Sequence, residues 1–278
     1  MSLYALAVHS SLGFKKEDYF FRYKGREFRY IPRWKENETD KVATILRRGN
    51  HVEANEAYRL LAELLSVISF ERDCRIILSS GVIAHGHGFD LEKFSGGYTE
   101  RRSIPVSELS DEIYFIPPVR NEAQSDVVRL YREARSSNSI YLEILFYWHI
   151  LSYPETDNQK AIQYVDSYLN HQHYVGGELA RIASDPMMLK DKKDFMSFGF
   201  YVDKAIQNSI AHFIRNPTRN EKGIDLDNFN QIKHFNDVCR VLKMASRYRI
   251  EKEFGLDEPH DISVFIYTRH SDARNRTS

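Results

Sequence analysis

The proline pair Pro117–Pro118 separates two parts of the chain whose residue patterns differ. Before it, residues 1–49 contain short extended runs, among them YFFRYKGREFRYIPRW, which has the pattern of a hairpin turning at Lys24–Gly25. Glycine in that turn can take the positive φ that tight hairpins need. After the pair, apolar residues recur at steps of three and four, which is typical of helices. Because proline ends regular structure, we expect a domain boundary here.

The two patterns together predict an α+β fold, in which a mixed sheet-and-helix domain is followed by a helical bundle. We assign residues 1–118 to the α+β domain, 119–256 to the bundle and 257–278 to a C-terminal strand and tail. Residues 261–270 alternate between apolar and polar positions and predict the last strand. The sequence leaves open whether this strand returns to the N-terminal sheet or packs on the helices.

Helices are expected at several positions along the chain. The first opens at Asn50, with Glu53 three places later in a capping-box arrangement, and runs to about Phe70. A last long helix begins after a cap at Asp225 or Asp227 and ends at Gly255. Between them, the periodicity of the bundle predicts helices over residues 123–135, 139–153, 158–171 and 194–215.

The helix predicted over residues 194–215, DFMSFGFYVDKAIQNSIAHFIR, is apolar over most of its circumference. A polar stripe runs along one edge at helical spacing and consists of Lys204, Asn208, His212 and Arg215. Histidine titrates near neutral pH, so His212 could act as an acid or a base. The same side chain could instead fix helix packing through a bond to a backbone carbonyl or to Asn208. We favour the packing role.

Charge and cysteine content argue against several classes of protein. Among 278 residues, Lys+Arg and Asp+Glu number 39 each, and this balance weighs against a general binder of polyanions. Cys74 and Cys239 exclude a disulfide framework and have no zinc-binding spacing. The most hydrophobic run, residues 140–151, is too short to cross a membrane. The first residues lack the pattern of a signal peptide, so we expect a cytoplasmic protein without membrane contact.

The sequence lacks the motifs of nucleotide-binding loops, nucleophile elbows and HExxH metal sites, so we expect no cofactor and no metal. His85 and His87 would point to the same side of a strand and could bind a metal. Since they have no third ligand at a recognisable spacing, a glycine-rich turn is the better interpretation. The aromatic and basic residues of the first hairpin could form a stacking platform for single-stranded nucleic acid. A half-exposed sheet face is the interpretation we favour.

The C-terminal half of the chain resembles a known family. The resemblance rests on AIQNSIAHFIR, on IDLDNFNQIKHFNDVCRVLKMASRYRIEKEFGL and on the aromatic helix YLEILFYWHIL. Together these segments resemble the helical half of MauJ-like proteins, a family named for a component of methylamine-utilisation clusters, whose helical half resembles HEPN domains. In catalytic HEPN ribonucleases an arginine and a polar residue precede a histidine by little more than a helical turn. The resemblance places that histidine at His212, the polar residue at Asn208 and the arginine position at Gln207.

The resemblance implies two competing functions. The family arginine is expected to stabilise the charged transition state, which the neutral Gln207 cannot do. Lys204 or Arg215 would have to supply the positive charge instead. The first hypothesis is therefore a non-catalytic accessory or interaction protein that forms a homodimer through its HEPN-like bundle. The alternative is a metal-independent HEPN-type ribonuclease that uses His212 and Asn208. RNA or nucleotide contact by Lys204 and Arg215, without cleavage, lies between the two.

Overall fold

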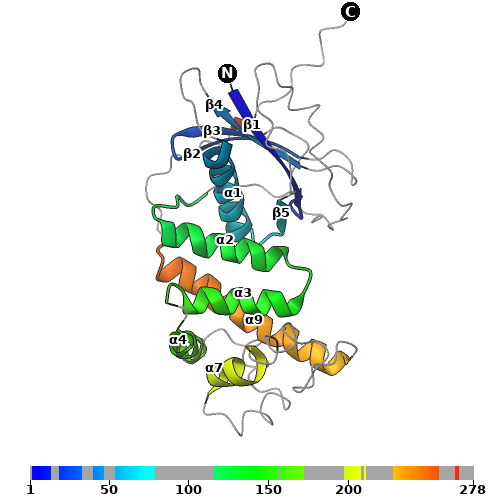
Figure 1. Ribbon diagram of the computed structural model, residues 1–278, viewed down its shortest axis with the longest axis vertical. Helices are drawn as coiled ribbons and strands as arrows, with labels where there is room; N and C mark the ends of the chain where they lie inside the picture. The colour runs from blue at the N-terminus through cyan, green and yellow to red at the C-terminus, as the bar shows by residue number, and fades with distance from the viewer. Residues whose placement is uncertain are drawn as a thin grey trace, which may run out of the picture. The chain divides into compact units, whose positions relative to one another are not determined.

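The computed structural model of the chain describes residues 2–13, 19–32, 40–46, 54–78, 116–155, 157–171, 197–207, 210, 228–256 and 267–268. The chain divides into two compact units, Met1–Ser136 with Leu256–Ser278, and Ser137–Gly255. The first unit contains a β-sheet and two of the described helices, and the second contains helices (Figure 1). The predicted α+β class is confirmed.

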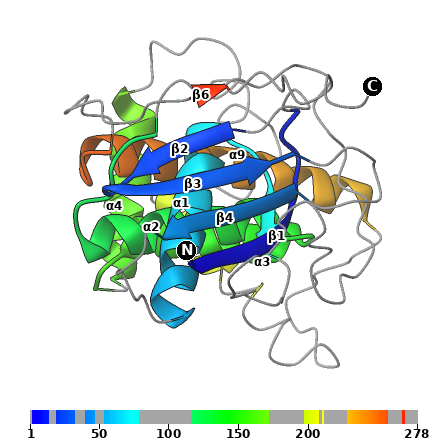
Figure 2. The same cartoon turned by 90° about the horizontal axis from the view of Figure 1, so that it is seen from above.

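The described strands of the first unit form one antiparallel sheet in the order β5-β1-β4-β3-β2-β6. Figure 2 shows β2, β3, β4 and β1 side by side, with the helix α1 behind them. The strand bounds are Ser2–Ser10 (β1), Tyr19–Tyr23 (β2), Arg26–Ile31 (β3), Asp40–Leu46 (β4), Ile76–Leu78 (β5) and Tyr267–Thr268 (β6).

The predicted hairpin is confirmed as β2 and β3, which pair with Tyr23 opposite Arg26. Its two turn residues, Lys24 and Gly25, have φ values of 47° and 70°. Both therefore lie in the left-handed region that a two-residue hairpin turn requires. Alternate residues of the two strands are buried, and these are mainly aromatic: Tyr19, Phe21, Tyr23, Phe28 and Tyr30.

The last strand joins the N-terminal sheet. β6 pairs with β2 in antiparallel register, with Thr268 opposite Tyr19 and Tyr267 opposite Phe20. This pairing decides the question that the sequence left open. It also explains why residues 256–278 belong to the first unit although they follow the helices in the chain.

Two helices complete the described part of the first unit. α1 (Ala54–Glu71) packs on the sheet, and α2 (Glu122–Ser136) packs against α1, where the rings of Phe70 and Tyr131 meet edge to face at 5.2 Å. Tyr131 also donates to Asp73 Oδ1 at 2.7 Å. The two compact units accordingly divide after Ser136, whereas the expected boundary at Pro118 precedes α2. The assignment of residues 1–118 to one domain and 119–256 to the next stays a prediction.

The second unit is built from α3 (Ile140–Ser152), α4 (Asn158–His171), α7 (Phe198–Tyr201), a π-helical segment (Val202–Gln207) and α9 (Phe229–Lys252). α3 and α9 pack along one another, and Ser246 Oγ donates to the carbonyl of Tyr147 at 3.1 Å. The buried apolar side chains at the centre include Ile144, Leu151, Val165, Val238, Leu242 and Ala245. The predicted helices 123–135, 139–153 and 158–171 match α2, α3 and α4 closely.

The start of α9 differs from the prediction. Its N-cap is Asn228, whose side chain accepts from the backbone N–H of Gln231 at 3.1 Å, and not Asp225 or Asp227. Asparagine caps helices as well as aspartate does, so residue type alone does not favour Asp225 or Asp227 over Asn228. Gly255 follows the helix at φ +66°, as expected for a residue that ends one.

No described helix is both long enough and apolar enough to cross a bilayer.

Candidate functional site

The candidate site begins at a short helix whose N-terminus is capped by Ser197. The Ser197 side chain accepts from the backbone N–H of Phe200 at 3.2 Å, and α7 follows over Phe198–Tyr201. The chain then continues as a π-helix over Val202–Gln207. π-helical turns are rare and frequently occur at functional sites. The segment is therefore the first place to look for chemistry in the second unit.

A glycine holds α7 close to α4. A Cβ on Gly199 would lie 2.5 Å from the carbonyl oxygen and 2.9 Å from the Cα of Ile162. The backbone N–H of Gly199 also donates to Asp166 Oδ1 at 2.8 Å. Only glycine permits this approach, so the contact requires glycine at this position of α7.

Asp203 is the central polar residue of the π-helical segment. Its side chain is only 1% exposed, and Oδ1 accepts from Asn158 Nδ2 at 2.7 Å. Asn158 Oδ1 in turn accepts from Trp148 Nε1 at 3.2 Å. A buried carboxylate is costly unless it is paired, and this chain of bonds supplies one partner from α4. The cluster joins the π-helical segment to α4 and α3.

Lys204 supplies the second partner of Asp203. Its Nζ lies 2.9 Å from Asp203 Oδ2, an ion pair that lacks the angles of a hydrogen bond. The ammonium also lies 5.7 Å from the centre of the Phe200 ring. The lysine side chain remains 48% exposed, so the buried carboxylate compensates a charge at the surface. The charge of Lys204 is therefore already compensated within the protein.

A tyrosine–histidine pair ties α7 to α9. Tyr201 Oη and His234 Nε2 lie 2.5 Å apart, and both side chains are buried. The rings meet edge to face at 5.8 Å between centroids. Such a pair fixes the helices relative to each other. It leaves this histidine nitrogen engaged with protein and not directed toward a substrate.

Arg249 holds the C-terminal end of α3. It donates to the backbone carbonyls of Ile150, Leu151 and Tyr153, and its Nε pairs with Glu253 at 2.8 Å. The last carbonyls of a helix have no partners within the helix, so a buried guanidinium with five donors suits this position. Here too a charged group serves the packing of the unit.

These helices lie in the part of the chain for which a comparison with known families succeeds. Residues 127–251 match the model of the family described as Methylamine utilization protein MauJ. This stretch is similar to that family, and we call it the MauJ-like stretch. It covers α3, α4, α7 and almost all of α9, together with most of α2. No curated protein and no solved structure matches the chain.

Of the site residues predicted within the MauJ-like stretch, the structure describes Lys204 fully and Gln207 through its backbone. Asn208, His212 and Arg215 lie outside the described residues, as do His85 and His87. Their proposed roles stay predictions. In the part of the chain that is described, no cluster of three or more His, Cys, Asp or Glu side chains could hold a metal ion.

The helix predicted over residues 194–215 is not a regular α-helix in its described part. The α-helical spacing that placed Lys204 on a stripe with later residues assumes 3.6 residues per turn. The π-helical turn over Val202–Gln207 is wider than an α-helical turn, so the 3.6-residue spacing does not hold within this segment. Sequence reasoning also missed Asp203 and Asn158. The available signal was that Asp203, a carboxylate, lies within a predicted helix that is apolar over most of its circumference.

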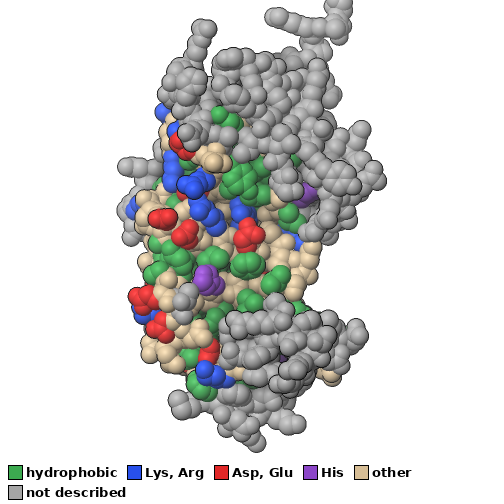
Figure 3. Space-filling view, in the orientation of Figure 1, with side chains coloured by type: hydrophobic (Ala, Val, Ile, Leu, Met, Phe, Trp, Pro, Cys, Tyr) green, Lys and Arg blue, Asp and Glu red, His purple; other side chains and the backbone are tan. Residues whose placement is uncertain are grey.

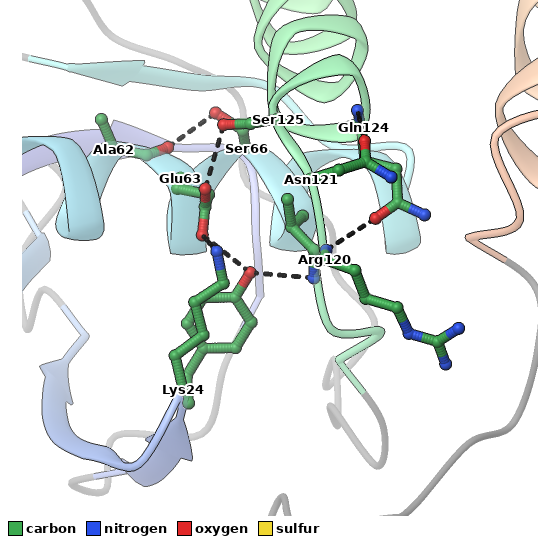
Figure 4. A network of polar contacts seen from close by, with 10 residues as sticks. Lys24, Ala62, Glu63, Ser66, Arg120, Asn121, Gln124 and Ser125 are labelled. Atoms are coloured by element: carbon green, nitrogen blue, oxygen red, sulfur yellow. Dashed lines mark hydrogen bonds and ion pairs between the residues drawn. The ribbon is translucent and has the colours of Figure 1, made fainter.

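A second polar cluster lies in the first unit, outside the MauJ-like stretch (Figure 4). Glu63 of α1 is 7% exposed, and its Oε1 accepts from Tyr23 Oη at 3.0 Å and pairs with Lys24 Nζ at 2.7 Å. Its Oε2 accepts from Ser125 of α2 at 3.0 Å. Burial, and then the Glu63 carboxylate, raise the pKa of Tyr23 well above its usual range. The carboxylate connects the hairpin to both helices.

All members of this cluster precede residue 127, including Ser125 of α2. Each described polar atom of Glu63 has a donor from the protein itself, and the cluster needs no ligand to be satisfied. On the face drawn in Figure 3, acidic side chains likewise lie among the basic ones. Neither observation indicates a phosphate-binding surface in the first unit.

Proposed function

We propose that the protein is a non-catalytic accessory protein, whose MauJ-like stretch forms the core of a HEPN-like bundle used for interaction. One observation carries the proposal. The buried carboxylate of Asp203 compensates Lys204, which is the described basic residue of the predicted polar stripe. Phosphoryl chemistry needs an uncompensated positive charge close to the developing negative charge. Gln207 does not provide one, and Lys204 is already paired.

The surrounding contacts support the same proposal. Tyr201 and His234 bond to each other, and Arg249 is used by helix carbonyls. Each of these groups could in principle act in catalysis, but each has a partner that holds the bundle together. Buried polar groups that are fully paired favour a rigid and unique packing, which suits a protein that presents a fixed surface.

The experiment is incubation of the full-length protein with mixed RNA in EDTA, beside the His212→Ala variant. His149→Ala is the matched control, because His149 is an exposed histidine on α3. We expect the same RNA recovery from all three proteins and from buffer. RNA loss with wild type and His149→Ala but not with His212→Ala would overturn the proposal.

Two further parts of the proposal concern assembly and location. We infer a homodimer formed through the bundle, which sedimentation velocity would detect as a species of twice the chain mass. We also place the protein in the cytoplasm. The two cysteines, Cys74 and Cys239, are buried and are not joined in a disulfide, which suits a reducing compartment.

One observation favours the alternative, a metal-independent HEPN-type ribonuclease. The π-helical turn ends at Gln207, directly before Asn208, and such turns often re-aim the residues that follow them. In that case His212 would act as the acid or base and Arg215 would supply the missing positive charge. The RNA assay separates the two functions, since the ribonuclease requires His212 and the accessory protein does not.

A further inference from the structure

The outer edge of β2 is only partly covered by another strand. β6 pairs there with Tyr19 and Phe20, whereas β2 continues to Tyr23. Figure 2 shows β6 beyond β2 at the margin of the sheet. Among the described residues, no strand lies beside Phe21–Tyr23 on that side. The second half of this edge strand therefore has no neighbour within the part of the chain that the structure describes.

The register of the hairpin shows which backbone groups face this edge. Tyr23 and Arg26 flank a two-residue turn, so they exchange backbone hydrogen bonds, and the pairs that do so alternate along the hairpin. The N–H and C=O groups of Phe20 and Arg22 consequently point away from β3 and toward the outer edge. Tyr267 of β6 lies opposite Phe20, whereas no described strand residue lies opposite Arg22 on this side.

Arg22 also carries a charge that the described residues do not compensate. Its side chain is exposed, and it forms no ion pair or hydrogen bond within the described part of the chain. The neighbouring cations Lys24 and Arg26 are paired, with Glu63 and Glu56 respectively. The open part of the edge thus combines unused backbone groups with a positive charge.

We propose that the outer edge of β2 is a docking site for an extended acidic segment of a partner protein, which joins the sheet as a strand and displaces β6. Extended peptides are commonly recognised in this way, by backbone hydrogen bonds at a sheet edge and by side chains at alternate positions. A partner strand that reaches Arg22 would bond to the backbone of both Phe20 and Arg22, whereas β6 does so at Phe20. The inference goes beyond the proposed function, because this edge belongs to the first unit and not to the bundle.

The side chains of β2 define the chemistry of the partner. In the antiparallel register of β6, a carboxylate would lie opposite Arg22 and an aromatic residue opposite Phe20, where β6 has Tyr267. The residue between them would lie opposite the buried Phe21, which favours a β-branched side chain. Opposite Tyr19, β6 has a threonine. In chain order the recognised segment is therefore acidic, β-branched, aromatic and β-branched.

Two other occupants fit this edge less well. Single-stranded RNA needs exposed aromatic faces on which its bases stack. Here Arg29 lies over the Phe20 ring, 5.9 Å from its centre, and Phe21 and Tyr23 are buried. A second copy of this chain would not supply the carboxylate through its edge strands, because neither β2 nor β6 contains an acidic residue.

The test uses the full-length protein and a fluorescein-labelled peptide that contains Glu-Val-Tyr-Thr. Its controls are the same peptide with Lys in place of Glu, and a version with N-methylated backbone amides that cannot form the strand hydrogen bonds. We expect fluorescence anisotropy to show binding of the Glu peptide, weakened at least about tenfold by Arg22→Glu. Arg59→Glu reverses an exposed charge on α1 and is the matched control, which should change the affinity less than about twofold.

A second variant tests the displacement of β6. Tyr267→Pro removes a backbone N–H of β6 at the position opposite Phe20, because proline has no N–H. With the edge vacated more often, the Glu peptide should bind at least about threefold more tightly than to wild type. The Lys peptide guards against misfolding, since it should bind Arg22→Glu more tightly than wild type, which a misfolded variant would not do.

The proposal is overturned if the Glu peptide does not bind, if the N-methylated peptide binds equally well, or if Arg22→Glu has no larger effect than Arg59→Glu. Unchanged affinity in Tyr267→Pro would also overturn it, because β6 would then not compete for the edge. Tighter binding of poly(U) RNA, or of a peptide with the sequence of residues 261–270, would assign the edge to nucleic acid or to the chain's own strand. None of these results alters the RNA-cleavage comparison with His212→Ala, so the two proposals fail separately.

Discussion

Replacing Asp203 tests whether the buried polar cluster holds the MauJ-like bundle together. Asp203→Ala removes the acceptor of Asn158 Nδ2, which lies 2.7 Å away, and the ion pair with Lys204 at 2.9 Å. Asn158 itself is exposed, but a hydrogen bond to a charged acceptor contributes about 1.5–3 kcal/mol. The ion pair adds little, about 0.5 kcal/mol, because Lys204 is half exposed and solvent screens it.

One effect acts in the opposite direction. The alanine variant no longer buries a carboxylate, which recovers part of its desolvation cost. We therefore expect a net loss of about 2 kcal/mol in the free energy of unfolding for Asp203→Ala. Asp203→Asn keeps an oxygen for Asn158 and loses only the ion pair, so its loss should be about 1 kcal/mol or less.

The assay is thermal unfolding followed by the fluorescence of Trp148, which is buried in the second unit and bonded to Asn158. The sequence has two tryptophans, so the Trp34→Phe background leaves Trp148 as the only reporter. At about 2–4 °C per kcal/mol, Asp203→Ala should lower the midpoint by about 4–8 °C. A midpoint within about 1 °C of the parent, or equal losses for the alanine and asparagine variants, would refute the reasoning.

Two other predictions follow from the packing and the buried hydroxyls. Gly199→Ala should lower the free energy of unfolding by about 2–3 kcal/mol, because the new Cβ would lie 2.5 Å from the backbone of Ile162. Gly255→Ala is the control. Gly255 has open space around it, so its substitution should lower the free energy of unfolding by only about 1 kcal/mol, the cost of alanine at a positive φ. Burial, and then the Asp40 carboxylate, raise the pKa of Tyr30 above its usual 10.0. Above pH 10 the Tyr30 hydroxyl therefore keeps its proton in the folded state and loses it in the unfolded state. The contribution of this group to the free energy of unfolding is complete below pH 10. Above pH 10, urea unfolding should show the free energy of unfolding falling by up to about 1.4 kcal/mol per pH unit. Tyr30→Phe should make that decline shallower, and an unchanged slope would contradict the assignment.

Local signals explain what the sequence predicted well. The hairpin was predicted because Gly25, which can take a positive φ, lies between two runs rich in aromatic residues. Helices α2, α3 and α4 were predicted because their apolar residues recur at a regular step and each buries one face. These features depend on residues close together in the chain.

The π-helical segment was not predicted because the residue pattern of the sequence does not distinguish it from an α-helix. The apolar residues around Val202 fit an ordinary helix of 3.6 residues per turn. What distinguishes the segment in the structure is the bond from Asn158 to Asp203 and the close approach of Gly199 to Ile162. Both connect α4 to residues far along the chain.

Two other features, the neighbour of β6 and the partners of Glu63, also depend on residues far apart in the chain. β6 joins β2 across most of the chain, and no pattern within residues 261–270 specifies that neighbour. Glu63 finds its donors in the hairpin and in α2, as Figure 4 shows. A buried carboxylate can be recognised from its place on an apolar helix face, but its partners are fixed only by the tertiary fold.

The most direct test of the account is the rate of RNA loss without metal. General acid–base catalysis by a histidine typically contributes a factor of about 10²–10⁴. If His212 has no catalytic role, the initial rate for wild type divided by that for His212→Ala is one, and His149→Ala gives the same rate. A ratio of about 100 or more, with His149→Ala unchanged, would contradict the account and establish the ribonuclease.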